Sequence, residues 1–247
     1  MNRRAADAAW LSLALAAAVF GAGCASPAPP AAASPASARA QPAAPTPVPL
    51  YEAQRRIDEY IRSGAYDADV GRVVAGARSW LEERAPRATK PAIVLDIDET
   101  SLSNWTAYRL NGWARIIRGE CDLENGPCGL RAWQSLARAT ALAPTLALAR
   151  RARELGVAVF FITGRPSNFR DATERNLREQ GYDWTGLVLE PDGQSFASAA
   201  DFKAPERRRI ADQGYTIVLN MGDQDSDLAG GFAERTFKLP NPVYYLP

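Results

Sequence analysis

The stretch KPAIVLDIDETSLSNW, residues 90–105, decides how the rest of the sequence is interpreted. Its four apolar residues AIVL are followed at once by carboxylates at Asp96, Asp98 and Glu99. An apolar run of this kind is typical of a buried strand, whereas crowded carboxylates repel one another and lose hydration on burial. We therefore expect a strand that ends in a site where something compensates the negative charge.

Two further apolar runs also end in polar residues, VAVFFITGR at residues 157–165 and YTIVLNMGDQDSD at residues 215–227. A short strand is expected at GLVLE. Helices are expected where apolar residues recur at helical spacing or where Pro and Gly mark helix ends: residues 51–85 (broken near Gly64), 144–155, 166–180 and 204–213. Strands alternating with helices predict an α/β fold, a Rossmann-like parallel sheet flanked by helices. The carboxyl ends of its strands would converge on one site.

Histidine is absent from the 247 residues of the chain. Its absence excludes a Ser-His-Asp triad, a histidine phosphoenzyme and a zinc site built on imidazole. Any chemistry must therefore use carboxylates, Thr, Lys, Arg or Cys. The formal net charge of +1 indicates no surface for binding a polyanion, so we expect no nucleic-acid partner.

The N-terminus has the pattern of an export signal: two arginines, an apolar stretch, and the small residues GAGC that end at Cys24. This pattern predicts a signal peptide over residues 1–23. Small residues before a cysteine resemble a bacterial lipoprotein box, so we expect a periplasmic protein anchored to the outer membrane by a lipid on Cys24. An ordinary secretory signal, with Cys24 incidental, is the alternative. Residues 24–50, rich in Ala and Pro, predict a disordered tether before a domain over residues 51–247.

The segment after the first strand, residues 101–140, is irregular and rich in Trp and Gly, and it resembles a small insertion. Cys121 and Cys128 stand in CDLENGPC, a spacing that in an exported chain suits a small loop closed by a disulfide better than a zinc site. Aromatic residues in or near the segment either stack on a leaving group or form local core, and both interpretations stay open. These residues are Trp105, Tyr108, Trp113 and Trp133.

Acidic residues also follow the last apolar run, at Asp223, Asp225 and Asp227. Bringing them beside Asp96 and Asp98 would be prohibitive unless a cation lay among them. Carboxylate oxygens are hard ligands, which favours Mg²⁺. Calcium is the alternative metal, but the run lacks the glycine and the glutamate of an EF-hand loop. A solvated acidic loop without metal is the other interpretation.

Three residues could serve a phosphate. Thr163 offers a hydroxyl at a strand end, and Gly164 lets the backbone approach closely. Lys203 lies just before a predicted helix, and its compact ammonium group suits phosphate oxygens. The alternatives are a strand-end cap for Thr163 and a solvated helix start for Lys203. The arginine run at residues 207–209 is interpreted as solvated helix surface.

The order of these pieces is informative. DIDET, then ITGR, then a lysine, then GDQDSD resembles the four motifs of the haloacid dehalogenase superfamily. More narrowly, VLDIDETSLSNW with GDQDSDL and the tail FKLPNPVYYLP resembles its acid phosphatase branch, which includes bacterial class B and class C acid phosphatases and the plant vegetative storage proteins. The resemblance covers residues 93–247.

The resemblance implies an acid phosphatase that acts on small phosphomonoesters, with a 5′-nucleotidase-like activity as one form. Asp96 would be the nucleophile that forms an aspartyl-phosphate, and Asp98 the general acid and base. Mg²⁺ would be bound by the Asp96 side chain, the Asp98 carbonyl and Asp223.

The remaining roles also follow from the resemblance. Thr163 and Lys203 would hold phosphoryl oxygens, with Gly164 beside them. Asp227 would orient Lys203 or a metal-bound water. Neither Asp225 nor Glu99 receives a role.

Three competing functions are weighed against this one. A non-catalytic storage or binding protein on the same fold would not need the nucleophile, which this chain retains at Asp96. A signalling receiver domain places its acidic pair before the phosphorylated aspartate, whereas here a second acidic cluster comes last. A dehalogenase does not need a proton donor at Asp98.

Overall fold

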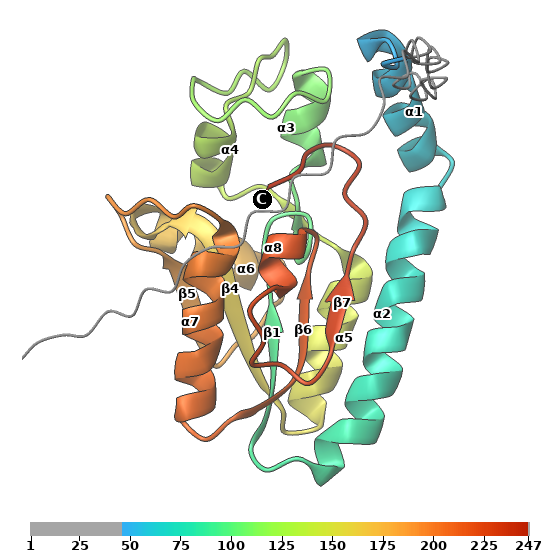
Figure 1. Cartoon of the computed structure of the whole chain (residues 1–247). Helices are drawn as coiled ribbons and strands as arrows, with labels where there is room; N and C mark the ends of the chain where they lie inside the picture. Colours follow the sequence, from blue (N-terminus) through green and yellow to red (C-terminus); the bar gives the residue numbers. More distant parts are fainter. Residues whose placement is uncertain (1–45, 247) are drawn as a thin grey trace, which may run out of the picture. The chain divides into compact units, whose positions relative to one another are not determined.

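The computed structural model describes residues 46–246 of the chain, and they form an α/β domain (Figure 1). Five strands pair in parallel in the order β5-β4-β1-β6-β7. The strands are β1 (Pro91–Leu95), β4 (Ala158–Pro166), β5 (Gly186–Glu190), β6 (Thr216–Gly222) and β7 (Thr236–Lys238). The predicted parallel sheet is confirmed, and β1, which carries the opening motif, is its central strand.

Side chains of β1 point alternately to the two faces of the sheet. Ile93 and Leu95 belong to the larger core cluster, together with buried residues of the helices that cover one face. Ala92 and Val94 belong to a smaller cluster with Phe202, on the opposite face. Both faces of the central strand are therefore buried, as expected for a parallel sheet flanked by helices.

The helices agree with the predicted segments, with one exception. On the larger-cluster side lie α1 (Leu50–Arg62), α2 (Ala65–Arg84), α5 (Ala143–Glu154) and α6 (Arg170–Glu179), and on the other side lies α7 (Ala199–Asp212). Gly64 separates α1 from α2 in a left-handed conformation (φ 78°), which glycine adopts without steric cost.

Helix α7 begins earlier than the sequence predicts. It starts at Ala199, where Ser198 and Asp201 form a capping box, and not at Ala204. Pro205 lies inside the helix. Lys203 is therefore a residue of the helix, and the prediction that it precedes the helix is wrong.

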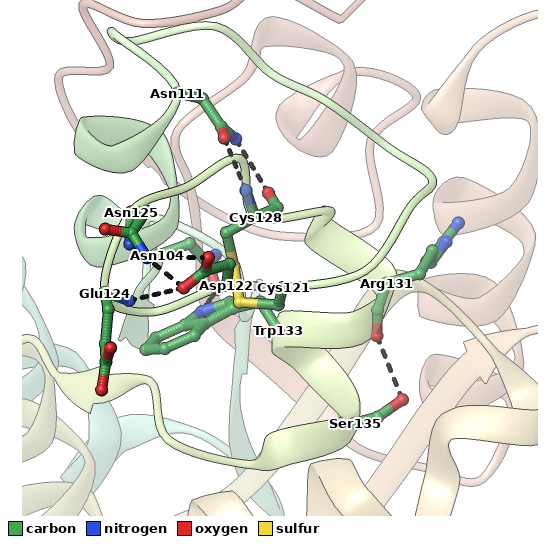
Figure 2. The surroundings of a disulfide bond; sticks show 10 residues. All are labelled: Asn104, Asn111, Cys121, Asp122, Glu124, Asn125, Cys128, Arg131, Trp133 and Ser135. Carbon is green, nitrogen blue, oxygen red and sulfur yellow. Dashed lines mark hydrogen bonds between the residues drawn. A yellow bond between two sulfur atoms is a disulfide. The ribbon is translucent and has the colours of Figure 1, made fainter.

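The insertion, residues 101–141, follows β1 and lies beyond the carboxyl ends of the strands (Figure 1). Its base is closed by two short antiparallel strands, β2 (Leu102–Ser103) and β3 (Thr140–Ala141). It contains two short helices that the sequence did not predict, α3 (Trp105–Leu110) and α4 (Leu130–Leu136). A disulfide joins Cys121 and Cys128 (Figure 2). The Asn111 side-chain amide donates to the Cys128 carbonyl at 2.8 Å and accepts from the Cys128 backbone N–H at 2.7 Å.

The predicted signal peptide over residues 1–23, Cys24 and most of the tether over residues 24–50 lie outside the described residues. Within residues 46–246, no helix combines the length and the apolar character that crossing a bilayer requires. Helix α1 begins at Leu50, next to the predicted start of the folded domain at Tyr51.

Candidate active site

Three carboxylates meet at the carboxyl end of the sheet. Asp96 follows β1 and Asp223 follows the neighbouring β6, while Asp227 lies in the short helix α8 (Asp225–Leu228). Each of the three offers an oxygen that lies within 4.8 Å of the other two, and all three side chains are buried. The backbone N–H of Asp96 donates to the Met221 carbonyl at 2.9 Å, so the strand ladder itself fixes the spacing between the two tips.

Lys203 reaches the same cluster from α7. Its Nζ donates to Asp96 Oδ1 at 2.5 Å and to Asp227 Oδ1 at 2.6 Å. Burial alone would lower the pKa of Lys203, but the charges of Asp227 and Asp96 raise it overall, so the side chain is held as an ammonium ion. The structure thus brings together four of the residues that the sequence singled out, and we call them the sheet-edge cluster: Asp96, Lys203, Asp223 and Asp227.

The cluster holds three carboxyl groups and one ammonium group. Burial raises the pKa of Asp96 well above its usual range, and Asp227 and Asp223 add to the rise against the opposing charge of Lys203. Burial, followed by the charge of Asp227, raises the pKa of Asp223 to about 7. Buried, oxygen-only ligands that one lysine does not neutralise fit a divalent cation of the Mg²⁺ type.

Asp223 is held in a fixed orientation. Its Oδ2 accepts hydrogen bonds from the side-chain amides of Gln224 at 2.6 Å and Asn241 at 2.7 Å. Its Oδ1 accepts from the Thr100 hydroxyl at 3.2 Å. Thr100 belongs to the opening motif and Asn241 to the C-terminal tail, so two distant segments orient one carboxylate.

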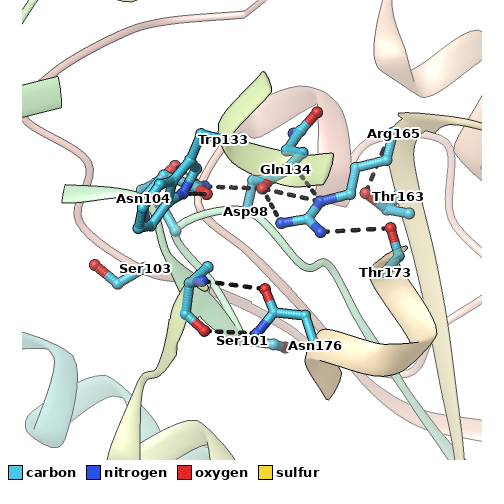
Figure 3. Close-up of polar contacts among 12 residues, drawn as sticks. Asp98, Ser101, Ser103, Asn104, Trp133, Gln134, Thr163, Arg165, Thr173 and Asn176 are labelled. Carbon is cyan, nitrogen blue, oxygen red and sulfur yellow. Dashed lines mark hydrogen bonds and ion pairs between the residues drawn. The ribbon is translucent and has the colours of Figure 1, made fainter. Parts of the chain in front are cut away.

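The Asp98 side chain is not a member of the sheet-edge cluster and pairs with Arg165 (Figure 3). Arg165 donates from Nη2 at 2.7 Å and from Nε at 3.1 Å, and Asn104 donates at 2.8 Å. Burial favours the neutral form of Asp98, yet the charge and hydrogen bonds of Arg165 lower its pKa overall. Arg165 is itself buried, and sequence reasoning missed it. Its position in the sequence could have indicated that it reaches the site, because Arg165 lies two residues after Thr163 in a strand, and side chains two residues apart point to the same face of a sheet.

Glu99, which received no role from the sequence, is fully buried with a left-handed backbone (φ 54°). Its carboxylate accepts from the Asn104 backbone at 2.6 Å and from the hydroxyls of Tyr244 at 3.0 Å and Tyr108 at 3.3 Å. Burial and the nearby Asp98 raise its pKa to about 7. Glu99 therefore connects the opening motif to the C-terminal tail.

The remaining candidate residues, Thr163 and Asp225, are not members of the sheet-edge cluster. Thr163 is buried in β4, where its Oγ1 accepts from the Arg165 backbone at 3.2 Å, and only its neighbour Gly164 lines the cavity. Asp225 is exposed and pairs with Lys238 at 2.7 Å.

The prediction of a solvated arginine run is wrong for Arg207. Its side chain is buried and donates to the carbonyls of Asp227 at 2.8 Å, Gly231 at 2.8 Å and Ala229. Arg208 and Arg209 are exposed as predicted. Arg207 lies four residues after Lys203, on the inward face of α7. This spacing could have indicated that Arg207 is buried while Arg208 and Arg209 are exposed.

A cavity of about 400 Å³ opens onto the sheet-edge cluster. The insertion contributes part of its wall: Tyr108, Arg115, Leu130, Arg131 and Gln134. Of the four aromatic residues considered from the sequence, only Tyr108 lines the cavity. Trp113 and Trp133 are buried, and their indole N–H groups donate to Asp58 and Asn104, so they belong to the local core.

The family model of the HAD superfamily, subfamily IIIB (acid phosphatase), matches residues 27–247. Acid phosphatase 1 of Solanum lycopersicum is 31% identical over 193 residues, which cover 77% of this chain and 73% of the relative. The stem 28 kDa glycoprotein of Glycine max is 34% identical over 192 residues, 76% of this chain and 72% of the relative.

A solved structure shares the fold. The class C acid phosphatase from Bacillus anthracis superimposes with a TM-score of 0.62 at 25% identity, over 79% of this chain and 86% of that chain.

Proposed function

Because this chain belongs to the acid phosphatases of HAD subfamily IIIB, and is thus a phosphomonoester hydrolase, we propose that it cleaves small phosphomonoesters with Mg²⁺ through an aspartyl-phosphate on Asp96. The observation that carries the proposal is the position of Asp96. Its Oδ1 lies 2.5 Å from Lys203 Nζ within the sheet-edge cluster, at the floor of the cavity.

The side chains of Asp96 and Asp223, with the main-chain carbonyl of Asp98, would hold the metal. When bound, Mg²⁺ offsets the charge of these carboxylates and of the phosphate dianion. Lys203 Nζ donates to Asp227, which supports the proposed role of Asp227 in orienting Lys203.

In the first step, the free Asp96 oxygen attacks phosphorus while the bond from phosphorus to the leaving oxygen breaks. Lys203 and the backbone at Gly164 hold the phosphoryl oxygens. The Thr163 hydroxyl is buried next to Gly164 and accepts one hydrogen bond, so its own proton is proposed to reach a phosphoryl oxygen only when substrate draws the backbone at Gly164 into contact.

Asp98 gives its proton to the departing alcohol and later takes one from the water that cleaves the acyl phosphate. The pairing with Arg165 opposes protonation of Asp98 in the free protein. Asp98 lines the cavity, so a phosphate dianion bound there would raise the pKa of Asp98 through the like charge, and substrate binding itself would prepare the proton donor.

The test combines turnover with trapping. The wild type should hydrolyse p-nitrophenyl phosphate, lose the activity in EDTA and regain it with Mg²⁺. In Asp98→Asn, slow hydrolysis of the intermediate should leave the peptide that contains Asp96 phosphorylated after an acid quench, as read by mass spectrometry. Activity that persists in EDTA would contradict the metal, and a phosphoryl group on another residue would contradict the nucleophile.

We further propose that the protein is exported and lipid-anchored through Cys24 to the outer membrane. The Cys121–Cys128 disulfide supports an oxidising compartment. Incorporation of labelled palmitate in the wild type but not in Cys24→Ser is the expected result, and label retained by Cys24→Ser would contradict it.

A further inference from the structure

Two guanidinium groups of the insertion line the cavity in addition to the sheet-edge cluster: Arg115 from the loop after α3, and Arg131 from the first turn of α4. Among residues 46–246, neither forms a salt bridge. Arg115 Nε is buried without a hydrogen-bond partner, and Arg131 Nη1 donates to the neutral side chain of Gln134 at 3.1 Å. Arg165 differs from both, because its guanidinium is fully buried against Asp98.

The two groups are held on aromatic rings. The Arg115 guanidinium carbon lies 4.9 Å from the centre of the Tyr244 ring, and that of Arg131 lies 5.4 Å from the Phe169 ring. Burial lowers the pKa of Arg131, and the charge of Arg115 lowers it further, although Asp98 acts in the opposite direction. Two cations near enough to repel each other, partly withdrawn from water, favour the approach of an anion.

The position of this pair relative to the chemistry is defined by a short chain of contacts. Arg131 contacts Gln134, and Gln134 Nε2 donates to Asp98 Oδ2 at 3.3 Å. Asp98 is the proposed proton donor to the leaving alcohol. The alcohol would therefore lie between the sheet-edge cluster and the insertion, with Arg131 on its far side.

We propose that Arg115 and Arg131 form a second anion subsite, and that the preferred substrates are phosphomonoesters whose leaving alcohol carries a second phosphate group. The inference rests on the function proposed above. Two planar guanidinium groups match a phosphate dianion in charge and in hydrogen-bond geometry. Glu190 also lines the cavity, and its charge acts on Arg131, so it offsets part of the attraction that Arg131 exerts on an anion and leaves Arg115 as the less compensated of the two cations.

The test compares kcat/KM for fructose 1,6-bisphosphate, fructose 6-phosphate and p-nitrophenyl phosphate at fixed ionic strength with Mg²⁺. We expect the wild type to favour the bisphosphate by about tenfold, beyond the statistical factor of about two for its two phosphates. Arg115→Gln and Arg131→Gln should each remove most of that preference, and Arg131→Lys should keep part of it. The matched control is Arg118→Gln, an exposed arginine of the insertion that does not line the cavity.

Only the ratio between substrates measures the subsite, because both arginines also lie within electrostatic reach of Asp98. A wild type without the preference, or variants that slow all three substrates alike, would overturn the subsite while leaving the proposed function intact. A wild type inactive on p-nitrophenyl phosphate with Mg²⁺ would overturn the proposed function and the subsite with it. Circular dichroism of each variant separates lost binding from lost folding.

Discussion

The sheet-edge cluster and the insertion both line the cavity, but they differ in whether their charged side chains are paired with groups of opposite charge. In the cluster, the one ammonium group contacts two carboxylates and every charged group is buried. On the insertion wall, Arg115 and Arg131 face the cavity without an acidic partner among the described residues. The comparison separates two tasks: a dense, paired cluster suits bond cleavage, whereas unpaired cations suit selection of the substrate.

The two regions also differ in what holds them. The backbone ladder between β1 and β6 fixes Asp96 relative to Asp223. The insertion combines short backbone pairing at its base with side-chain and covalent links, including the Trp133–Asn104 hydrogen bond at 3.0 Å and the Cys121–Cys128 disulfide. A change in the insertion should therefore alter substrate preference before it disturbs the cluster.

The largest effect is expected at the nucleophile. Asp96→Asn keeps the shape of the side chain but removes the attacking oxygen, so kcat on p-nitrophenyl phosphate should fall by at least about a thousandfold. Asp225→Asn is the matched control, because this exposed aspartate follows the neighbouring strand β6 and its carboxylate pairs with Lys238 outside the sheet-edge cluster. Wild-type kcat in Asp96→Asn would remove the cluster from the chemistry.

The second-largest effect is expected on stability, at the ion pair between Arg165 and Asp98. Arg165→Gln leaves Asp98 largely buried without its cation, which should lower the free energy of unfolding by about 3 kcal/mol in a urea titration. Arg170→Gln, which breaks an exposed pair with Glu174, should change it by less than about 0.5 kcal/mol.

A double variant sharpens this test. If the loss in Arg165→Gln comes from an unpaired carboxylate, adding Asp98→Asn should restore part of the stability. Additive losses in the double variant would mean that the two side chains do not act as a pair.

The sequence was most informative where local patterns dictate position. Apolar runs that end in carboxylates placed Asp96 and Asp223 at adjacent strand ends, because parallel strands share one carboxyl edge. Arg165 and Arg207 were missed because arginine is usually exposed, and burial depends on partners that lie far away along the chain, such as Asp98 and the loop at Gly231.

The insertion was the least predictable region. Its helices are short, and contacts between distant residues hold them, such as Trp113 with Asp58. No periodic pattern of residues 101–140 reports such contacts. The two arginines that line the cavity therefore look like ordinary surface residues in the sequence.

Opening the disulfide should affect the insertion more than the cluster. Replacing both Cys121 and Cys128 by Ser removes closure of a short loop, which should cost about 2 kcal/mol of unfolding free energy. KM for fructose 1,6-bisphosphate should rise more than KM for p-nitrophenyl phosphate, because Arg115 and Arg131 flank the loop in sequence. Equal changes for both substrates would show that the insertion and the cluster are not separable in this way.

The smallest effect is expected on the pH dependence of the stability that Mg²⁺ adds, because this dependence follows the titration of Asp223. In the metal-free protein, burial raises the pKa of Asp223 from 3.8 to about 7, so its neutral form stabilises the fold and that contribution is lost as pH rises from about 4 to about 7.

Mg²⁺ requires the ionised form of Asp223, so the stabilising effect of Mg²⁺ should be small near pH 5. It should approach about 1.4 kcal/mol near pH 8, at a Mg²⁺ concentration of roughly ten times its Kd. The arginines of the insertion do not titrate in this range, so the pH-dependent difference in Tm with and without Mg²⁺ reports on the sheet-edge cluster and on Glu99, whose pKa is also raised to about 7. Asp223→Asn should abolish that difference while Asp225→Asn keeps it, and a Mg²⁺ effect that is independent of pH would place the metal elsewhere.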